Sequence, residues 1–161
     1  IALFFLLSCG CLDNLDESRA WNTKGEAYHD LGRYEEAVSA FDHAVALDPE
    51  NGEAWRNRGL SLSQLNRSSE AEESYSRAFA IDADDSEAWY FRALTLSAGG
   101  NITGALESTD RAVTNVPKSH DEAILLSDSW RLRGDLLLKM DREEEANESY
   151  KMAQQAVIST I

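Results

Sequence analysis

Residues 20–51 read AWNTKGEAYHDLGRYEEAVSAFDHAVALDPEN, and the same order of tryptophan, small, alanine and aromatic positions returns along the chain. Trp21 is followed by Trp55 and Trp89 at intervals of 34 residues, and by Trp130 after a further 41. A fixed period of this length is typical of repeat proteins, in which each unit is one supersecondary element. The spacing therefore predicts an array of four similar units.

Four further positions keep a constant distance from each tryptophan. A small residue stands four positions after it, alanine sixteen after it, a residue that is aromatic in three of the units twenty after it, and alanine again twenty-three after it. In that order the positions are Gly25, Gly59, Ala93 and Gly134; Ala37, Ala71, Ala105 and Ala146; Phe41, Tyr75, Thr109 and Tyr150; and Ala44, Ala78, Ala112 and Ala153. Small residues allow two helices to approach closely, and the aromatic ring fills the remaining gap. Each unit is therefore predicted to be two antiparallel helices.

These offsets resemble those of the tetratricopeptide repeat (TPR) family. The resemblance covers residues 18–158 and implies an all-α solenoid of four helix-turn-helix repeats forming a right-handed superhelix. The repeats are expected at residues 18–51, 52–85, 86–119 and 120–158, the last with an extended first helix. TPR proteins share a mode of binding and not a partner, so the resemblance implies a protein-binding scaffold whose partner stays open.

The fourth unit contains seven residues more than the period predicts, which is close to two helical turns. Ser119 and Glu122 have the spacing of a capping box, so we expect the first helix of this unit to start near Ser119 and to be about 10 Å longer than its counterparts. The apolar residues 123–126 on the extension are expected to pack on Val113 and Val116. The alternative is that they form a docking surface for a partner or a second copy.

Other local signals concern the second helices. Ser68 or Ser69 is expected to cap the second helix of the second unit, and Asp141 with Glu144 the last helix. Gly104 lies inside the second helix of the third unit, where glycine costs about 1 kcal/mol relative to alanine. The third unit is therefore predicted to be the least stable of the four.

Composition limits the class of partner. The 161 residues allow one domain, and 29 Asp and Glu against 15 Lys and Arg give a formal net charge of −14. Such a chain would repel the phosphate backbone of nucleic acids, so no nucleic-acid partner is expected. The acidity either keeps a helical surface soluble or suits a basic partner.

The N-terminal residues differ in kind from the repeats. Residues 1–7 are wholly apolar, and residues 1–14 are interpreted as a truncated signal and lipobox segment. Leu6-Leu7-Ser8-Cys9 resembles a bacterial-type lipobox, which makes Cys9 the first candidate for lipidation and Cys11 the second. The expected location is exported and membrane-anchored through this lipid alone, with a cytoplasmic location as the alternative.

The TPR resemblance also implies a concave binding face on the first helices of the repeats. The residues expected to bind a peptide there are Arg56, Asn57, Leu60, Tyr90, Leu94 and Arg131. An apolar floor flanked by arginines suits a peptide that carries an acidic group, because arginine can bind a carboxylate through two hydrogen bonds. The alternative is that these arginines are solvated or paired with Glu53, Glu87 and Asp128.

One subtype of TPR domain captures the C-terminal carboxylate of heat-shock chaperones through a basic and amide clamp. The matching positions here are Asn22, Glu26, Asn57, Glu87 and Phe91, of which only Asn57 fits. Glu26 and Glu87 would repel that ligand, so the chaperone-adaptor role is disfavoured. No catalytic constellation, metal site or cofactor motif is evident, so we expect neither enzymatic activity nor a cofactor.

Two alternatives to a peptide-binding scaffold remain. A self-associating component of an envelope complex would use the extended helix of the fourth unit, and a cytoplasmic TPR adaptor would need no export signal. Asn66 and Asn101 lie in Asn-x-Ser/Thr sequons in turns, which makes them candidate glycosylation sites if the chain is exported.

Overall fold

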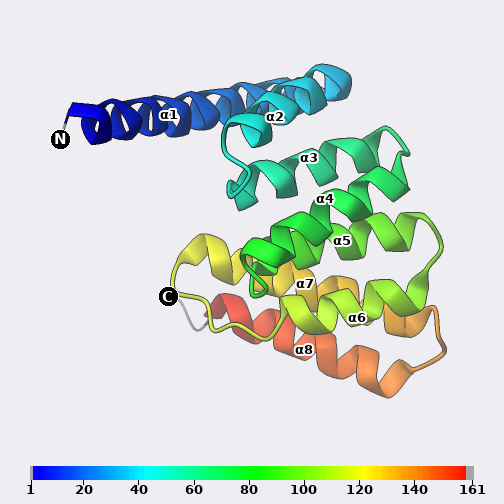
Figure 1. Cartoon of the computed structure of the whole chain (residues 1–161). Helices are drawn as coiled ribbons and strands as arrows, with labels where there is room; N and C mark the ends of the chain where they lie inside the picture. The colour runs from blue at the N-terminus through cyan, green and yellow to red at the C-terminus, as the bar shows by residue number, and fades with distance from the viewer. Residues whose placement is uncertain (1, 159–161) are drawn as a thin grey trace. The chain divides into compact units, whose positions relative to one another are not determined.

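The computed structural model describes residues 2–158 and the side chains of residues 14–157. Its described residues form eight α-helices and no strand, which confirms the all-α prediction. The helices are α1 (Ala2–Asp30), α2 (Tyr34–Leu47), α3 (Gly52–Gln64), α4 (Ser68–Ile81), α5 (Ser86–Ala98), α6 (Ile102–Ala112), α7 (His120–Leu138) and α8 (Glu143–Ile158). Successive helices pair as α1–α2, α3–α4, α5–α6 and α7–α8, each pair joined by a short turn (Figure 1).

The chain divides into two compact units, Ile1–Ala83 and Asp84–Ile161. In the first unit α2 also packs on α3, and α1 lies beside α3. In the second unit α6 also packs on α7, and α5 lies beside α7. Within each unit, therefore, the first helices of neighbouring repeats are adjacent.

The pairing of small and aromatic residues holds each helical pair together. A Cβ atom on Gly25 would lie 2.5 Å from the Phe41 ring, and one on Gly59 would lie 2.7 Å from the Tyr75 ring. Gly134 stands in the same relation to Tyr150, at 2.6 Å. No side chain fits at those distances, so the close approach predicted from the sequence is confirmed.

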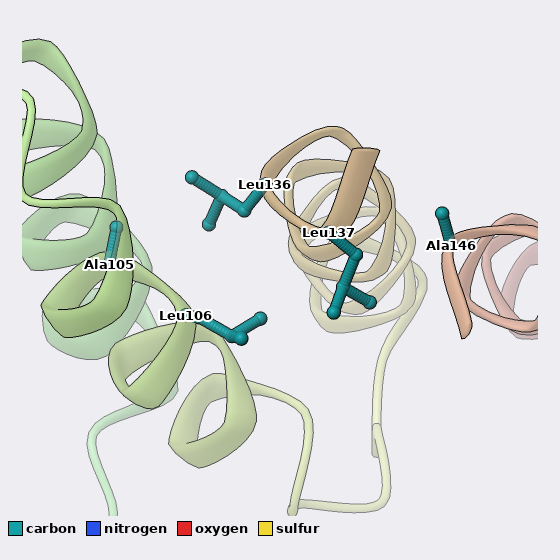
Figure 2. Close-up of a cluster of buried hydrophobic side chains, with 5 residues drawn as sticks. All are labelled: Ala105, Leu106, Leu136, Leu137 and Ala146. Atoms are coloured by element: carbon teal, nitrogen blue, oxygen red, sulfur yellow. The ribbon is translucent and has the colours of Figure 1, made fainter. Parts of the chain in front are cut away.

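The alanines of the repeat form the centre of each pair. Ala37, Ala71, Ala105 and Ala146 all have 0% exposure, as predicted. Around Ala105 and Ala146, Leu106 of α6 and Leu136 and Leu137 of α7 complete a buried cluster, in which Leu136 extends toward the Ala105 side of α6 (Figure 2). This cluster joins α6, α7 and α8 in the core of the second unit.

Two of the repeat tryptophans pack against buried residues of the first unit. Trp21 and Trp55 pack on the buried Ala44, Val45 and Ala54, and the Trp21 ring stacks on His43 with centroids 4.5 Å apart. The tryptophans therefore belong to the scaffold.

The turn within each pair contains one residue of positive φ at a constant place, eleven residues after the tryptophan. These residues are Gly32 (φ 72°), Asn66 (φ 58°), Gly100 (φ 80°) and Asp141 (φ 57°). Glycine, asparagine and aspartate tolerate this left-handed conformation best, which explains the residue types at the position. The prediction that Asp141 caps α8 is therefore wrong, because Asp141 is a turn residue and α8 begins at Glu143.

The prediction of a serine cap on α4 is also wrong. Arg67 occupies the N-cap position without a side-chain cap bond, and Ser68 is already helical. The Arg67 guanidinium instead binds Glu70, with Nη2 2.5 Å from Oε2. Arg33 with Glu36 and Arg142 with Glu145 repeat this arrangement in the first and fourth repeats, so an arginine–glutamate pair replaces the expected cap.

Helix α7 begins where the sequence predicted. The Ser119 hydroxyl accepts a hydrogen bond from the Glu122 backbone N–H at 3.1 Å, and α7 has 19 residues where α3 and α5 each have 13. Ala123 on the extension is fully buried, but Val116 is 82% exposed. The predicted packing against Val116 is therefore wrong, because the segment after α6 carries that side chain into solvent.

Within residues 2–158, no helix combines the length and apolar character needed to cross a bilayer. The candidate lipidation sites Cys9 and Cys11 lie outside the residues whose side chains are described.

Candidate protein-interaction faces

Helices α1 and α3 of the first unit present a polar face, named here the α1–α3 face and consisting of Asn22, Glu26, Glu53, Arg56 and Asn57. Asn22 and Glu26 lie one helical turn apart on α1, and the other three residues lie in the first two turns of α3. The predicted site residues Arg56, Asn57 and Leu60 all belong to α3, and Leu60 is half-buried.

Asn57 is already engaged by its own chain. Its Nδ2 donates a hydrogen bond to Glu26 Oε1 at 2.9 Å and lies 3.5 Å from Asn22 Oδ1. Asn22 Nδ2 donates to the same Glu26 oxygen at 3.0 Å. The two amides thus hold the Glu26 carboxylate in place, whereas the sequence predicted that Asn57 would bind a peptide.

Arg56 is also less available than expected. Its side chain is only 15% exposed, and its Nη2 lies 3.9 Å from Glu53 Oε1. A guanidinium that is mostly covered and beside a carboxylate is poorly placed to bind an acidic ligand. The geometry here matches the alternative in which Arg56 pairs with Glu53.

Burial raises the pKa of Glu26, and the nearby charge of Glu53 raises it further. The amides of Asn22 and Asn57 oppose this by stabilising the ionised form, but the net direction of the pKa is upward. The α1–α3 face therefore carries a fixed carboxylate whose negative charge its surroundings disfavour.

A cavity of about 490 Å³ opens on this face between α1, the α2–α3 turn and α3. Its lining includes four carboxylates, those of Glu26, Asp48, Glu50 and Glu53, and one guanidinium, that of Arg19. The remaining lining is mainly polar and uncharged. Because carboxylates outnumber the guanidinium, the lining of the cavity is negatively charged.

Helices α5 and α7 of the second unit present a different face, named here the α5–α7 face and consisting of Tyr90, Phe91, Leu94, Asp128 and Arg131. The Tyr90 and Phe91 rings are 5.7 Å apart and half-buried, and Leu94 is 36% exposed. Burial raises the pKa of Tyr90, with a smaller contribution from Asp128. These side chains give α5 a partly exposed apolar surface.

Arg131 lies at the edge of the α5–α7 face. Its side chain is 63% exposed, and its Nη1 lies 3.5 Å from Asp128 Oδ1. An exposed pair of this kind contributes little to stability, so Arg131 can exchange Asp128 for a ligand group at small cost.

The sequence reasoning missed a recurring arginine three residues after the tryptophan. Arg58 donates to Asp42 Oδ1 at 2.7 Å and to Ser74 Oγ at 2.6 Å, and Arg133 makes the same bonds to Asp110 and Ser149. Arg92 likewise donates to Ser108 Oγ at 2.8 Å. The signal was available, because these serines all stand nineteen residues after a tryptophan. These arginines therefore join the two helices of their repeats.

Other polar positions are exposed or already in contact with groups of the same chain. Asn66 and Asn101 are both exposed in turns, and the Asn101 side chain caps α6 by accepting from the Gly104 N–H at 3.0 Å. His29 Nδ1 lies 2.9 Å from Ser61 Oγ, and burial lowers its pKa. Among the described residues no group of three or more His, Cys, Asp and Glu is placed to hold a metal ion.

The family model described as tetratricopeptide repeat matches residues 13–52, 22–86 and 56–120. The chain belongs to the TPR family. This family consists of protein-binding scaffolds that are typically non-catalytic. A sequence comparison with curated proteins gave no match.

Solved TPR structures resemble the fold at low sequence identity. MamA is 19% identical with a TM-score of 0.74, the alignment covering 86% of this chain and 77% of MamA. PilF of Pseudomonas aeruginosa is 17% identical with a TM-score of 0.81, covering 89% of this chain and 63% of PilF. The second TPR domain of Spaghetti (RPAP3), bound to the HSP90 peptide SRMEEVD, is 21% identical with a TM-score of 0.59, covering 63% of this chain and 94% of that domain.

Proposed function

We propose that this TPR protein is a non-catalytic scaffold that binds a protein or peptide partner on the exposed sides of the first helices of its repeats. The observation that supports this most directly is the α5–α7 face, where two half-buried aromatic rings and the exposed Leu94 lie side by side with no catalytic group among them. Rigid aromatic and aliphatic side chains bordered by polar groups are typical of the sites that anchor a partner.

The Spaghetti domain with its bound peptide supports peptide binding as the mode for this chain too. The acidic SRMEEVD peptide itself is a poor model for the ligand of the first unit. There Asn57 binds Glu26, and Arg56 lies beside Glu53. The chaperone-adaptor role therefore stays disfavoured.

The test is a selection of 12-residue peptides from a display library against the whole chain, followed by fluorescence polarisation. Leu94→Asp should weaken binding of the selected peptides by roughly tenfold or more, because it places a charge in the apolar floor. Leu31→Asp is the matched control, since Leu31 is 69% exposed in the α1–α2 turn. Equal affinity of both variants for the peptides would contradict the proposal.

Self-association through α7 is the second candidate. It is favoured by Ile124, which is 43% exposed on the extended part of that helix. Light scattering over a hundredfold concentration range tests it, because a dimer that Ile124→Glu converts to a monomer would establish it. A mass that stays monomeric throughout would remove this candidate.

For location we propose export and a lipid anchor at Cys9, with Cys11 as second choice and the cytoplasm as the alternative. The support is the apolar run before Leu6-Leu7-Ser8-Cys9. Intact mass and membrane fractionation of the product expressed from its own start codon test this proposal. A soluble, unprocessed chain would contradict it.

A further inference from the structure

The cavity on the α1–α3 face is lined by more negative than positive side chains. Four carboxylates and one guanidinium line its volume of about 490 Å³. The guanidinium belongs to Arg19, whose side chain is 77% exposed and 3.7 Å from Asp16, a residue outside the lining. A volume of this size lies in the range of ligand pockets, roughly 300 to 1,000 Å³.

Glu26 is the carboxylate that the fold places most firmly. Asn22 is 5% exposed, and both it and Asn57 donate to Glu26 Oε1, at 3.0 and 2.9 Å. Two helices are thus used to fix one carboxylate at a cavity wall. Fixed groups lose little conformational entropy on binding, so they recognise a ligand better than mobile ones do.

The chain itself supplies Glu26 with little compensation. The pKa of Glu26 is shifted by the burial of its side chain, by the Glu53 carboxylate and by the two amides. No lysine or arginine contributes to this shift. Two neighbouring carboxylates disfavour each other's ionisation. A cation entering the cavity would compensate the charge of Glu26, which lacks the neighbouring guanidinium that Glu53 has in Arg56.

We propose that this cavity is the subsite for a lysine or arginine side chain of the protein partner. The inference rests on the proposed function and specifies the charge of the partner side chain that the first unit binds. It reverses the expectation from the sequence, in which the arginines of the binding face, including Arg56, would favour an acidic group. The net charge of −14 acts in the same direction, because it attracts a basic partner over long range.

A metal ion is a poorer occupant than an ammonium or guanidinium group. No set of three or more metal-ligating side chains gathers in the described part of the chain. The cationic head of a side chain can instead donate to separate carboxylates across an open cavity, and its aliphatic stem continues into the rest of a bound peptide.

Three synthetic peptides test the proposal on the whole chain: acetylated and amidated GSLKLSG, and the same peptide with glutamate or glutamine in place of lysine. Binding at low salt is followed through the ¹⁵N–¹H signals of the Asn22, Asn51 and Asn57 side-chain amides. The lysine peptide should shift these signals to saturation. The glutamine and glutamate peptides should bind at least about fivefold more weakly, because the charge complementarity is lost.

The double variant Glu26→Gln and Glu53→Gln should weaken binding of the lysine peptide by roughly tenfold. Glutamine keeps an oxygen that can accept from Asn22 and Asn57, so folding should be retained, which circular dichroism checks. The matched control is Glu35→Gln with Glu73→Gln, which removes the same charge from exposed positions on α2 and α4.

An equal loss in the control variant would overturn the subsite, because general surface charge would then explain the binding. Absence of saturable shifts at the three amides would overturn it as well. The proposed function is contradicted by a different result, namely equal affinity of the Leu94→Asp and Leu31→Asp variants for the selected peptides. The subsite would also be overturned if all three peptides changed only the NMR signals of Tyr90, Phe91 and Leu94, and to the same extent. That result would still support the proposed scaffold function.

Discussion

The second and third repeats solve one packing problem in two ways. In the second, Gly59 on α3 leaves room for the fully buried Tyr75 ring of α4. In the third, Ala93 carries a methyl group at the equivalent place and Thr109 replaces the ring, and both are fully buried. The smaller Thr109 side chain leaves room for the methyl group of Ala93, so the repeat accepts more than one combination of residues at these two positions.

The same two repeats differ at the start of their second helices. Arg67 binds Glu70 in the second repeat, whereas Asn101 caps α6 in the third. A Cβ atom on Gly104 would lie 2.8 Å from Asn101 Nδ2, so glycine leaves room for the capping side chain. Gly104, which the sequence marked as a weakness, therefore has a compensating role.

Their exposed faces differ most. On α3, Asn57 contributes to a polar face around Glu26, whereas on α5, Tyr90 and Leu94 form an apolar one. The positions that hold the helices together recur, and those that face outward vary freely. The residues that pack the helices and the residues that determine the character of the exposed face are therefore different positions of the repeat.

The largest effect is expected from Gly59→Ala, which adds a methyl group 2.7 Å from the Tyr75 ring. Because Tyr75 has no exposed surface into which to move, we expect the unfolding free energy to fall by about 2 to 3 kcal/mol. Urea denaturation measures it. The control is Gly52→Ala, whose Cβ would lie at an ordinary 3.4 Å from Ile81 and should change little.

Adding Tyr75→Thr to Gly59→Ala copies the third repeat into the second. The double variant should be more stable than the sum of the two single changes predicts, because each relieves the defect of the other. Strict additivity would show that a smaller side chain at position 75 does not make room for the added methyl group at position 59.

The sequence predicted the scaffold well because its signal is repeated. The offsets from Trp21 to Gly25, Ala37 and Phe41 return in the other units, and every repetition supports the same helical pairing. The start of α7 at Ser119 was also predictable, because a capping box is a local pattern. Asn66 was correctly predicted to lie in a turn. The turn position of Asp141 was missed, although aspartate is one of the residues that can replace glycine in the left-handed conformation.

The polarity of the α1–α3 face could not be read from the sequence. Asn57 was expected to serve a ligand because its own position was considered alone, but its partners Asn22 and Glu26 lie 35 and 31 residues away. The exposure of Val116 likewise depends on the path of an irregular segment. Contacts made only once in the fold leave no periodic signal.

A largely buried arginine of the second repeat should contribute more to the free energy of unfolding than an exposed one. Arg58, which is 17% exposed and bonded to Asp42 and Ser74, should cost about 1 to 2 kcal/mol when replaced by methionine. Arg67→Met is the matched comparison, because its pair with Glu70 is 43% and 46% exposed and should cost less than about 1 kcal/mol. Urea denaturation of both decides the order, and equal losses would contradict the distinction.

The smallest effect is expected from Glu26→Gln, and its sign tests the charge of the α1–α3 face. The pKa of Glu26 is raised above its usual 4.5, so between the two pKa values the folded chain binds more protons than the unfolded chain. Stability contributed by this group is therefore complete below about pH 4.5 and is lost as pH rises through the folded pKa. At pH 7 the variant should be more stable by up to about 0.5 kcal/mol, and near pH 4 the gain should disappear. Urea denaturation at both pH values measures this, with Glu73→Gln on α4 as the exposed control. A variant less stable than the parent at pH 7 would mean that the amides of Asn22 and Asn57 stabilise the ionised Glu26 more than burial and Glu53 destabilise it. The negative charge of Glu26 would then already be compensated within the chain, which would argue against a cation subsite.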